Sequence, residues 1–237
     1  MSDQQAEALS ALSALSTPHL ADACLRLGLP VRCGPAGLVA LSGGMRCAGR
    51  VLPVRHVGSV DVFFEALEYS RPGDVMVVDN GGRLDEACVG DLAVLELQRA
   101  GLAGAVVWGL HRDTGELLRI GLPLFSLGAT PAGPLGVGVR HPDGLELAHV
   151  GPWVVTAADV AVGDRDGVIF LPAARLPEIA AAADAVRVTE ERQAEAMRAG
   201  TSLREQTRFD RYLAAREANP ALTFREHLRA VGGAIEE

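Results

Sequence analysis

Buried strands and helices alternate in the middle of the chain, and this pattern constrains the fold most. Two runs rich in β-branched residues, Asp74–Asp79 and Gly104–Trp108, predict buried strands. A short helix is expected between them over Leu92–Ala100, and another over Thr114–Ile120 leads into a third apolar run, Leu122–Phe125. Successive strands joined by helices are typical of a parallel sheet, because parallel neighbours need a crossover connection. The sequence therefore predicts an α/β core.

The segments before this core continue the pattern. Ser16-Thr17-Pro18 offers a hydroxyl cap and a proline in the first turn, which predicts a helix that ends at Gly28. Residues 45–57 alternate loosely and predict a strand. Residues 60–69 carry apolar side chains at helical spacing, so a helix is expected there.

The texture changes after Gly133 to turn-rich β structure, with a hairpin turn expected over Asp164–Gly167. From Leu176 the chain is rich in Ala and Arg and predicts a long helix. Its apolar seam includes Leu176, Ile179, Ala183, Val186 and Met197, and it passes through Glu190 and Gln193. We expect residues 1–175 to form one α/β unit. Residues 176–237 are expected to form a helical C-terminal arm that packs on a neighbouring subunit.

The composition excludes one kind of chemistry. All 22 cationic side chains of the 237-residue chain are arginines, and there is no lysine. Schiff-base aldolases, pyridoxal-phosphate enzymes and phosphate-loop proteins all depend on a lysine amine. These three classes are therefore excluded.

The charge and hydrophobicity of the chain limit which partners and which cellular location are expected. The formal net charge is −8 and no basic cluster is present, so nucleic acid is not expected as a partner. No apolar run reaches the ~18 residues of a membrane span, and no membrane association is expected. The four cysteines lack metal-site spacing and are interpreted as reduced, small apolar residues. A cytoplasmic protein is expected.

Polar residues follow the two predicted central strands. Ligands gather at the carboxyl ends of parallel strands, where this chain carries Asn80-Gly81-Gly82 and His111-Arg112-Asp113. Gly90-Asp91-Leu92-Ala93 resembles a helix start, whose unpaired N–H groups suit a carboxylate. Arg112 can bind the same anion with two hydrogen bonds, and Asp113 is a hard oxygen ligand for Mg2+ or Mn2+. These residues predict an anion site beside a metal ligand.

Simpler interpretations of the same residues stay open. An Arg-Asp pair after a strand is often a helix cap with a surface ion pair, and a Gly-Gly pair often marks only a turn. His111 fits either a general acid/base or a hydrogen-bonded structural residue. Without a G-x-G-x-x-G segment after either strand, a dinucleotide cofactor is not expected.

The stretch from Gly73 to Pro134 resembles the RraA-like family, which includes class II pyruvate aldolases acting on 4-hydroxy-4-methyl-2-oxoglutarate and 4-carboxy-4-hydroxy-2-oxoadipate. The matching motif is Asp, twenty residues, then Arg-Asp, here Asp91 followed by Arg112-Asp113. A Gly-Asp-Val-x-Val-Val-Asp strand and a Gly-x-Pro-x-Phe segment accompany the motif. The resemblance extends to residues 159–168 and, more weakly, to Gly200.

The resemblance implies a role for each matching residue. Asp113 would hold the metal largely through ordered waters, and Arg112 would bind the keto acid and stabilise its enolate. The backbone amides of Leu92 and Ala93 would bind the pyruvyl carboxylate, and Asp91 would orient the polar network or handle a proton. The family also brings an acidic residue from the C-terminal helix of an adjacent subunit. Glu190 and Glu191 lie at the matching place, although Glu190 could instead pair with a nearby arginine.

The resemblance also implies a fold, an assembly and an activity. The fold would be a layered α/β/β/α domain of the swivelling type, assembled as a trimer or as a hexamer built from trimers. The activity would be metal-dependent release of pyruvate from a 4-hydroxy-2-keto diacid, with oxaloacetate decarboxylation as a second reaction. Some members of the family bind and inhibit a ribonuclease instead, which is the alternative. The residues Leu110-His111 before Arg112 are bulkier than the small residues of the aldolases, so the substrate stays open.

Overall fold

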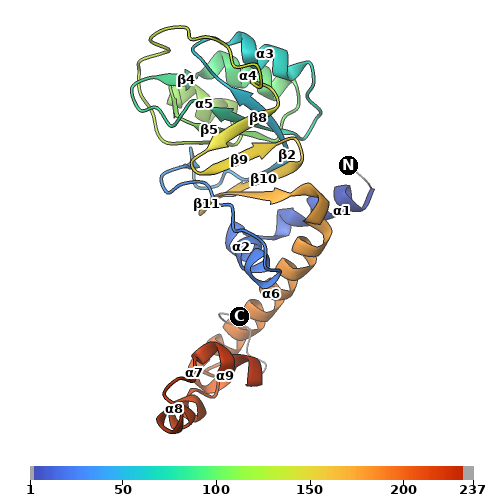
Figure 1. The fold of residues 1–237 in the computed structure, drawn as a ribbon, viewed down its shortest axis with the longest axis vertical. Helices are drawn as coiled ribbons and strands as arrows, with labels where there is room; N and C mark the ends of the chain where they lie inside the picture. Colours follow the sequence, from blue (N-terminus) through green and yellow to red (C-terminus); the bar gives the residue numbers. More distant parts are fainter. Residues whose placement is uncertain (1–2, 232–237) are drawn as a thin grey trace.

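A computed structural model describes residues 3–231 and contains a curled, seven-stranded sheet (Figure 1). Its strands are β1 (Val39–Ala40), β2 (Cys47–Arg55), β3 (Val75–Asp79), β5 (Gly104–Trp108), β7 (Leu124–Ser126), β10 (Asp159–Asp164) and β11 (Gly167–Pro172). They lie in the order β1-β7-β5-β3-β2-β10-β11. The four strands β7, β5, β3 and β2 run parallel, which confirms the predicted α/β core.

The curl of the sheet begins at β2, which belongs to two different pairings. Residues 47–50 pair antiparallel with β10, whereas residues 51–55 pair parallel with β3. The sheet therefore turns back on itself, and strands far apart in its order face each other. A Cβ on Gly163 of β10 would lie 2.5 Å from the ring of Phe125 of β7, so only glycine allows this close approach.

Three helices cover the outer face of the parallel strands. They are α3 (Asp61–Leu67), α4 (Asp91–Arg99) and α5 (Thr114–Ile120), each close to a predicted range. Their apolar sides pack on alternate residues of the strands. Members of this core include Val62, Phe63, Val94, Leu97, Leu117, Val54, Met76, Val78 and Val107.

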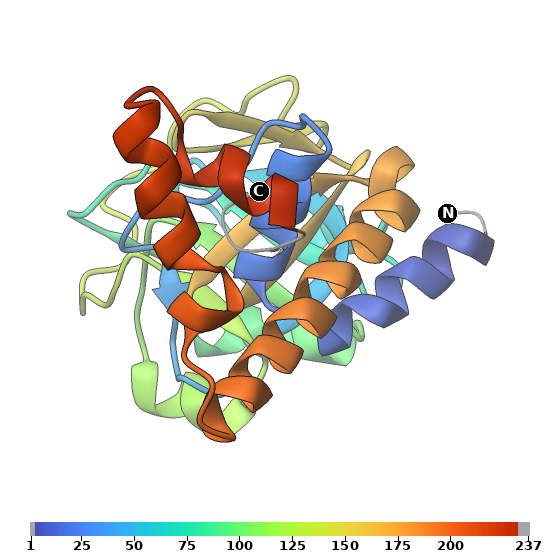
Figure 2. The same cartoon turned by 90° about the horizontal axis from the view of Figure 1, so that it is seen from below.

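The opposite face carries two further layers. The hairpin of β8 (Leu147–Val150) and β9 (Trp153–Thr156) packs inside the curl against the parallel strands. The helices α1 (Asp3–Ala11), α2 (Thr17–Arg26) and α6 (Leu176–Arg198) pack on β10 and β11 (Figure 2). The predicted α/β/β/α layering is confirmed, although α1 was not predicted.

Local sequence signals explain where α2 begins and ends and where the β10–β11 hairpin turns. The Ser16 side chain accepts the His19 N–H, and His19 Nδ1 accepts the Ser16 N–H at 3.2 Å, which forms a reciprocal cap at the start of α2. Gly28, with a φ of 65°, follows the last turn of this helix. The predicted hairpin turn is also confirmed, since Asp164 pairs directly with Gly167.

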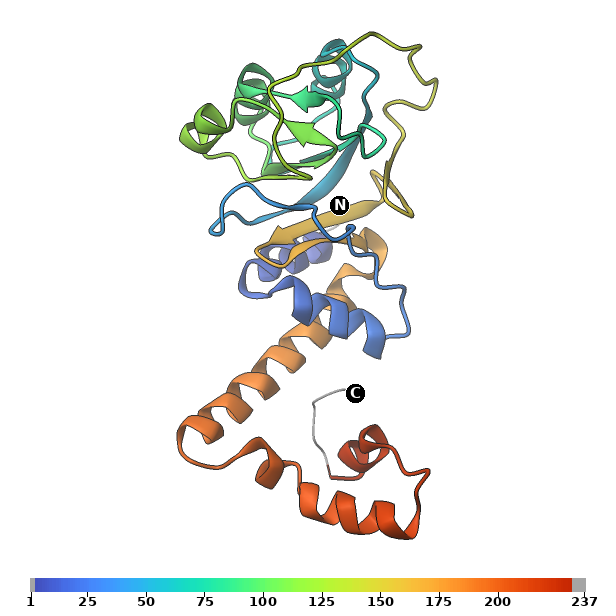
Figure 3. The same cartoon turned by 90° about the vertical axis from the view of Figure 1, so that its left-hand side faces the viewer.

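The C-terminal arm leads away from the sheet (Figures 1 and 3). After α6 come α7 (Leu203–Gln206), α8 (Phe209–Ala218) and α9 (Phe224–Val231). The last two helices share a small aromatic cluster of Phe209, Tyr212, Phe224 and His227. The apolar seam of α6 is buried only as far as Val186, and Met197 is 49% exposed. The prediction that the seam extends to Met197 is therefore wrong for a single chain. None of the helices within residues 3–231 is long and apolar enough to cross a bilayer.

Candidate functional site

Two short parallel strands, β4 (Ala87–Val89) and β6 (Leu110–His111), build the frame of the site. Val89 pairs with His111, and the Arg112 N–H donates to the Val89 carbonyl at 2.9 Å. Asp91 and Asp113 each lie two residues beyond the paired positions. The register of this small sheet therefore brings the two separated parts of the motif side by side.

Asp113 has a strained backbone and an unusual side-chain direction. Its φ of 60° and ψ of 36° lie in the left-handed region, which is uncommon for a residue other than glycine. Although Asp113 is at the N-cap of α5, its side chain makes no capping hydrogen bond. Its Oδ2 instead lies 3.4 Å from the Asp91 backbone nitrogen and 3.4 Å from Arg112 Nε. The cap interpretation thus fails for α5, the helix that Asp113 precedes, because the carboxylate instead meets the first N–H of α4 and the Arg112 side chain.

The Arg112 guanidinium lies between two glycines. A Cβ on Gly133 would be 2.7 Å from Nη1, and a Cβ on Gly90 would be 3.2 Å from Nε. The side chain is 47% exposed, and Asp113 is its only ion-pair partner among residues 3–231. Most of its donors therefore face open space and are available to an anion.

The first turn of α4 is already partly occupied by the carboxylates of the protein. Asp91 Oδ1 accepts the Leu92 N–H at 2.7 Å, and Asp113 Oδ2 is the acceptor near the Asp91 N–H. The Ala93 N–H also lies in this first turn, where backbone donors lack helical partners. An incoming carboxylate must therefore displace the Asp91 side chain before it can use the Leu92 N–H.

The predicted anion-binding residues line one cavity of about 640 Å³, called here the Arg112 cavity. The cavity is lined by the start of α4 and by Val60 and Phe64 at the start of α3. Buried His56 and Cys88 also line it. The predicted residues that it brings together are Gly90, Asp91, Leu92, Ala93 and Arg112.

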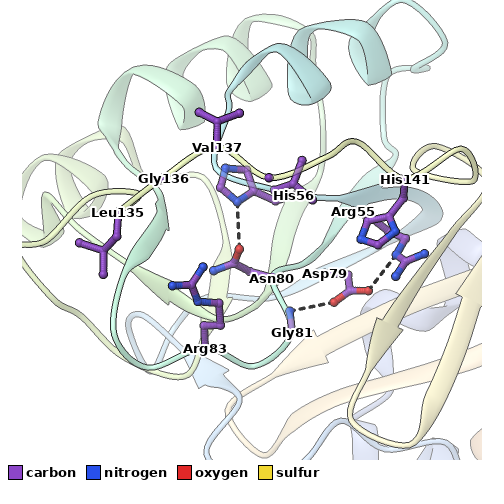
Figure 4. Close-up of a pocket in the computed structure, with 12 residues that line it drawn as sticks. Arg55, His56, Asp79, Asn80, Gly81, Arg83, Leu135, Gly136, Val137 and His141 are labelled. Carbon is purple, nitrogen blue, oxygen red and sulfur yellow. Dashed lines mark hydrogen bonds and ion pairs between the residues drawn. The ribbon is translucent and has the colours of Figure 1, made fainter.

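The glycine-rich loop after β3 lines a different cavity, of about 590 Å³, called here the Asn80 cavity (Figure 4). Asn80 and Gly81 lie on it together with Arg55 and Arg83. The predicted substrate-binding set is therefore divided between two cavities. His56 lines both, so it is the residue at which they meet.

Gly82 has a packing reason for its identity. Its φ is 67°, and a Cβ there would lie 2.7 Å from the indole ring of Trp108. Gly82 lines neither the Arg112 cavity nor the Asn80 cavity. This geometry favours the turn interpretation over substrate binding.

His111 lies within β6 rather than in a loop. Its ring is 3% exposed, Nδ1 is 2.7 Å from Ser126 Oγ, and Nε2 is 3.0 Å from Thr114 Oγ1. Burial lowers the pKa of His111, so the ring is held neutral. Both nitrogens are engaged inside the protein, which favours the structural interpretation of this residue.

Glu190 and Glu191 lie on the exposed part of α6, which leads away from the sheet and from α4 of the same chain (Figure 1). Glu190 Oε2 is 3.1 Å from His19 Nε2. Glu190 therefore pairs with a histidine, whereas the alternative interpretation expected a nearby arginine. Both carboxylate oxygens of Glu191 accept from Arg187 at 2.8 Å. One chain does not bring either glutamate to Asp113.

The donor set near Asp113 suits a hard cation that keeps most of its waters. Within residues 3–231, no group of three or more His, Cys, Asp or Glu side chains is placed to hold a metal ion. The Asp113 carboxylate is 37% exposed and lies near the Asp91 backbone, so its outer face is open to solvent. Mg2+ is usually bound by one or two carboxylates plus waters, and this arrangement fits that habit.

Two buried residues near the cavities were not predicted. His56 follows the last residue of β2, a strand whose carboxyl end was not considered as a ligand site. Glu86 is fully buried, pairs with Arg83 Nη1 at 2.8 Å, and accepts the Leu135 N–H at 2.7 Å. Glu86 thus holds the 133–138 segment, which contributes residues to both cavities. A polar residue directly after an apolar strand was the available signal for His56.

The layered α/β fold and the paired Asp and Arg-Asp segments define an α/β protein in which Arg112 and Asp113 lie beside the start of a helix. The model of the RraA-like family, described as Aldolase/RraA, matches residues 17–170, and the chain belongs to this family. It is 34% identical over 139 residues to the 4-hydroxy-4-methyl-2-oxoglutarate aldolase of Thermus thermophilus, covering 58% of this chain and 83% of that protein.

Solved structures show the same fold. RraAS2 of Streptomyces coelicolor, described as an unusual member of the RNase ES inhibitor RraA protein family, has a TM-score of 0.68 and 27% identity. The match covers 81% of this chain and 98% of that one. A structure of the RNA-processing inhibitor RraA from Thermus has a TM-score of 0.57 and 30% identity, covering 66% of this chain and 92% of that one.

Proposed function

We propose that this protein is a divalent-metal-dependent lyase that cleaves a 4-hydroxy-2-keto diacid and releases pyruvate. Oxaloacetate decarboxylation is proposed as a second activity of the same site. One observation carries the proposal: the Arg112 guanidinium and the start of α4 line one cavity, and Asp113 Oδ2 lies 3.4 Å from both Arg112 Nε and the Asp91 nitrogen. The aldolase name of a relative that is 34% identical over 139 residues supports the same reaction class.

The reaction needs positive charge where the enolate oxygen forms. Arg112 supplies a planar guanidinium whose donors are open to the cavity. The carboxylate of the keto acid would bind at the Ala93 N–H and, once Asp91 has turned away, at the Leu92 N–H. A divalent cation held by Asp113 would add further charge stabilisation at the enolate oxygen. Since the chain has no lysine, an amine route to the enolate is absent.

A second copy of the chain completes the site in this proposal. Glu190 or Glu191 would reach the metal from a neighbouring subunit, because α6 leads away from its own cavity (Figure 1). The assembly would be a trimer or a hexamer built from trimers. The arm of α7–α9 has its own aromatic cluster apart from the sheet, which suits a role in packing on a neighbour (Figure 3).

The second candidate is a non-enzymatic protein that binds a ribonuclease. It is favoured by the descriptions of two solved relatives as ribonuclease or RNA-processing inhibitors. A protein-binding role gives no reason for Asp113 to adopt a left-handed backbone beside an open guanidinium. The lyase is therefore the leading proposal.

The test measures pyruvate release from hydroxy-keto diacids and from oxaloacetate, with Mg2+ or Mn2+ and after chelation by EDTA. Activity that depends on the metal is expected, and Arg112→Ala should remove it while the elution volume in size-exclusion chromatography stays unchanged. Arg140→Ala is a matched control, because this arginine pairs with Asp61 and Glu65 and does not line the Arg112 cavity. Absence of metal-dependent pyruvate from every substrate would refute the lyase, and ribonuclease inhibition by the same sample would then support the second candidate.

A further inference from the structure

His56 is a buried histidine at the carboxyl end of β2 that lines both cavities. Figure 4 shows it in the Asn80 cavity. Its ring is held in place, because the residue is 6% exposed and the ring stacks on Phe63 with centroids 5.4 Å apart. Arg112 and Asp91 line the same Arg112 cavity. An imidazole therefore borders the space in which the proposed substrate would bind.

The two ring nitrogens of His56 have different surroundings. Nδ1 lies 2.9 Å from Asn80 Oδ1, and the Gly58 N–H approaches the same nitrogen at 3.3 Å. The two contacts require opposite states of Nδ1, and we assign the proton to Nδ1 because the shorter contact is to an acceptor oxygen, so the longer Gly58 contact is not a hydrogen bond in this tautomer. Nε2 has no hydrogen-bond partner among residues 3–231, and it is not fully buried. Its lone pair is therefore not used by the described part of the protein.

The environment of His56 keeps the ring neutral. Burial is the largest influence and lowers the pKa of His56. The hydrogen bond to Asn80 and the charges of Glu86 and Asp61 act in the opposite direction, and Arg83 lowers the pKa again. A neutral imidazole with one free nitrogen is the form that can accept a proton at neutral pH.

We propose that His56 is the general acid/base of the lyase and that Asn80 is a positioning residue that fixes its tautomer. This inference rests on the proposed function. It adds a catalytic residue that neither the Asp91–Arg112–Asp113 motif nor the family resemblance supplies. It also gives Asn80 a role different from direct substrate binding.

The proton balance of cleavage needs only one such group. His56 Nε2 takes the proton of the 4-hydroxyl, the C3–C4 bond breaks, and C4 becomes a carbonyl while the bond electrons form the enolate of pyruvate. The imidazolium then returns the same proton to C3, which gives the methyl group of pyruvate. No proton is gained or lost overall, so no further co-reactant is required.

The test follows exchange of the methyl protons of pyruvate with D2O by NMR in the presence of Mg2+, which needs no knowledge of the natural substrate. Wild-type protein is expected to catalyse the exchange, and His56→Gln should slow it by about 100-fold or more. Binding of pyruvate, measured by calorimetry, should persist in His56→Gln. His141→Gln is the control, since this exposed histidine lines only the Asn80 cavity.

Asn80→Asp provides a second variant in case His56→Gln does not fold. A carboxylate on Nδ1 raises the pKa of the imidazole, so the acid limb of the pH–rate profile should move to higher pH. Unchanged exchange and an unchanged pH profile in both variants would refute the role of His56 and leave the lyase standing. If wild-type protein neither exchanges pyruvate protons nor releases pyruvate from any keto diacid, the proposed function itself fails.

Discussion

Replacing Gly90 by alanine tests whether the Arg112 and Asp113 side chains form the reaction site. A Cβ at this position would lie 2.6 Å from Asp113 Oδ2 and 3.2 Å from Arg112 Nε. Ordinary carbon contacts begin near 3.4 Å, so the carboxylate must retreat by about 0.8 Å. The backbone accepts alanine without strain, because its φ of −136° is extended. Both affected side chains are partly exposed and can move.

The expected result is a large kinetic effect with a small effect on stability. A misplacement of about 1 Å in a reacting group costs about 100-fold in rate, or about 2.7 kcal/mol of transition-state stabilisation. We expect kcat/KM for pyruvate release to fall by about that factor, while the melting temperature stays within about 4 °C of wild type. Gly115→Ala in α5 is the matched control, because its Cβ would meet nothing within 4 Å. It should leave turnover unchanged and stabilise the helix by up to ~1 kcal/mol.

The result that refutes this reasoning is a Gly90→Ala protein with wild-type kcat/KM. Such a protein would show that the positions of Arg112 and Asp113 are irrelevant to the chemistry. Measuring the melting temperature on the same sample separates local displacement from unfolding. A crystal structure of the variant would report the movement of the Asp113 carboxylate directly.

Three further predictions concern charge and protonation. Arg112→Lys removes the planar fork and should lower kcat/KM by about 100-fold with an unchanged elution volume, whereas wild-type kinetics would contradict bidentate binding. Glu190→Gln should weaken Mg2+ binding in calorimetry and Glu191→Gln should not, since Glu191 is already held by Arg187; equal affinities in both would exclude Glu190. Burial lowers the pKa of His111, so the unfolded chain binds more protons and the free energy of unfolding should decrease as pH falls below about 6.5. Urea unfolding of wild type and His111→Gln at pH 7.5 and 5.5 checks this, and an equal loss in both would exclude His111 as the cause.

The sequence predicted the central strands and helices because their boundaries carry strong local signals. Asp74–Asp79 lies between Gly73 and a glycine-rich loop, and its five strand residues are all buried. The start of α2 was predictable from Ser16 and Pro18, since capping depends only on residues within one turn. In each case the decisive interactions are local.

The missed elements depend on contacts between distant segments. β4 and β6 have three and two residues, too few for periodicity to identify, and they exist because they pair with each other. The exposure of Met197 likewise depends on where the chain turns after α6. His56 and Asn80 are 24 residues apart, and only the parallel pairing of β2 with β3 brings them together.

The division of the predicted site between two cavities has the same origin. Asn80-Gly81-Gly82 and Arg112-Asp113 both follow central strands, so strand order alone suggests one shared pocket. The segment after Gly82, however, runs into β4, and this strand lies between the loop and the start of α4. His56 borders both spaces from the neighbouring strand β2.

The spacing of the Asp91 and Arg112-Asp113 motif acquires a structural meaning from the β4–β6 register. The interval from Val89 to His111 is 22 residues, and the interval from Asp91 to Asp113 is the same. The twenty intervening residues are the length of one crossover through α4 and β5, which sets how the chain returns to the same edge. The spacing that places the two carboxylates is shorter: each Asp follows its paired strand residue, Val89 or His111, by two positions. A slip of one residue in a strand pair turns side chains to the opposite face. The short, easily overlooked β4–β6 pair is therefore the element that positions Asp113 beside the first turn of α4.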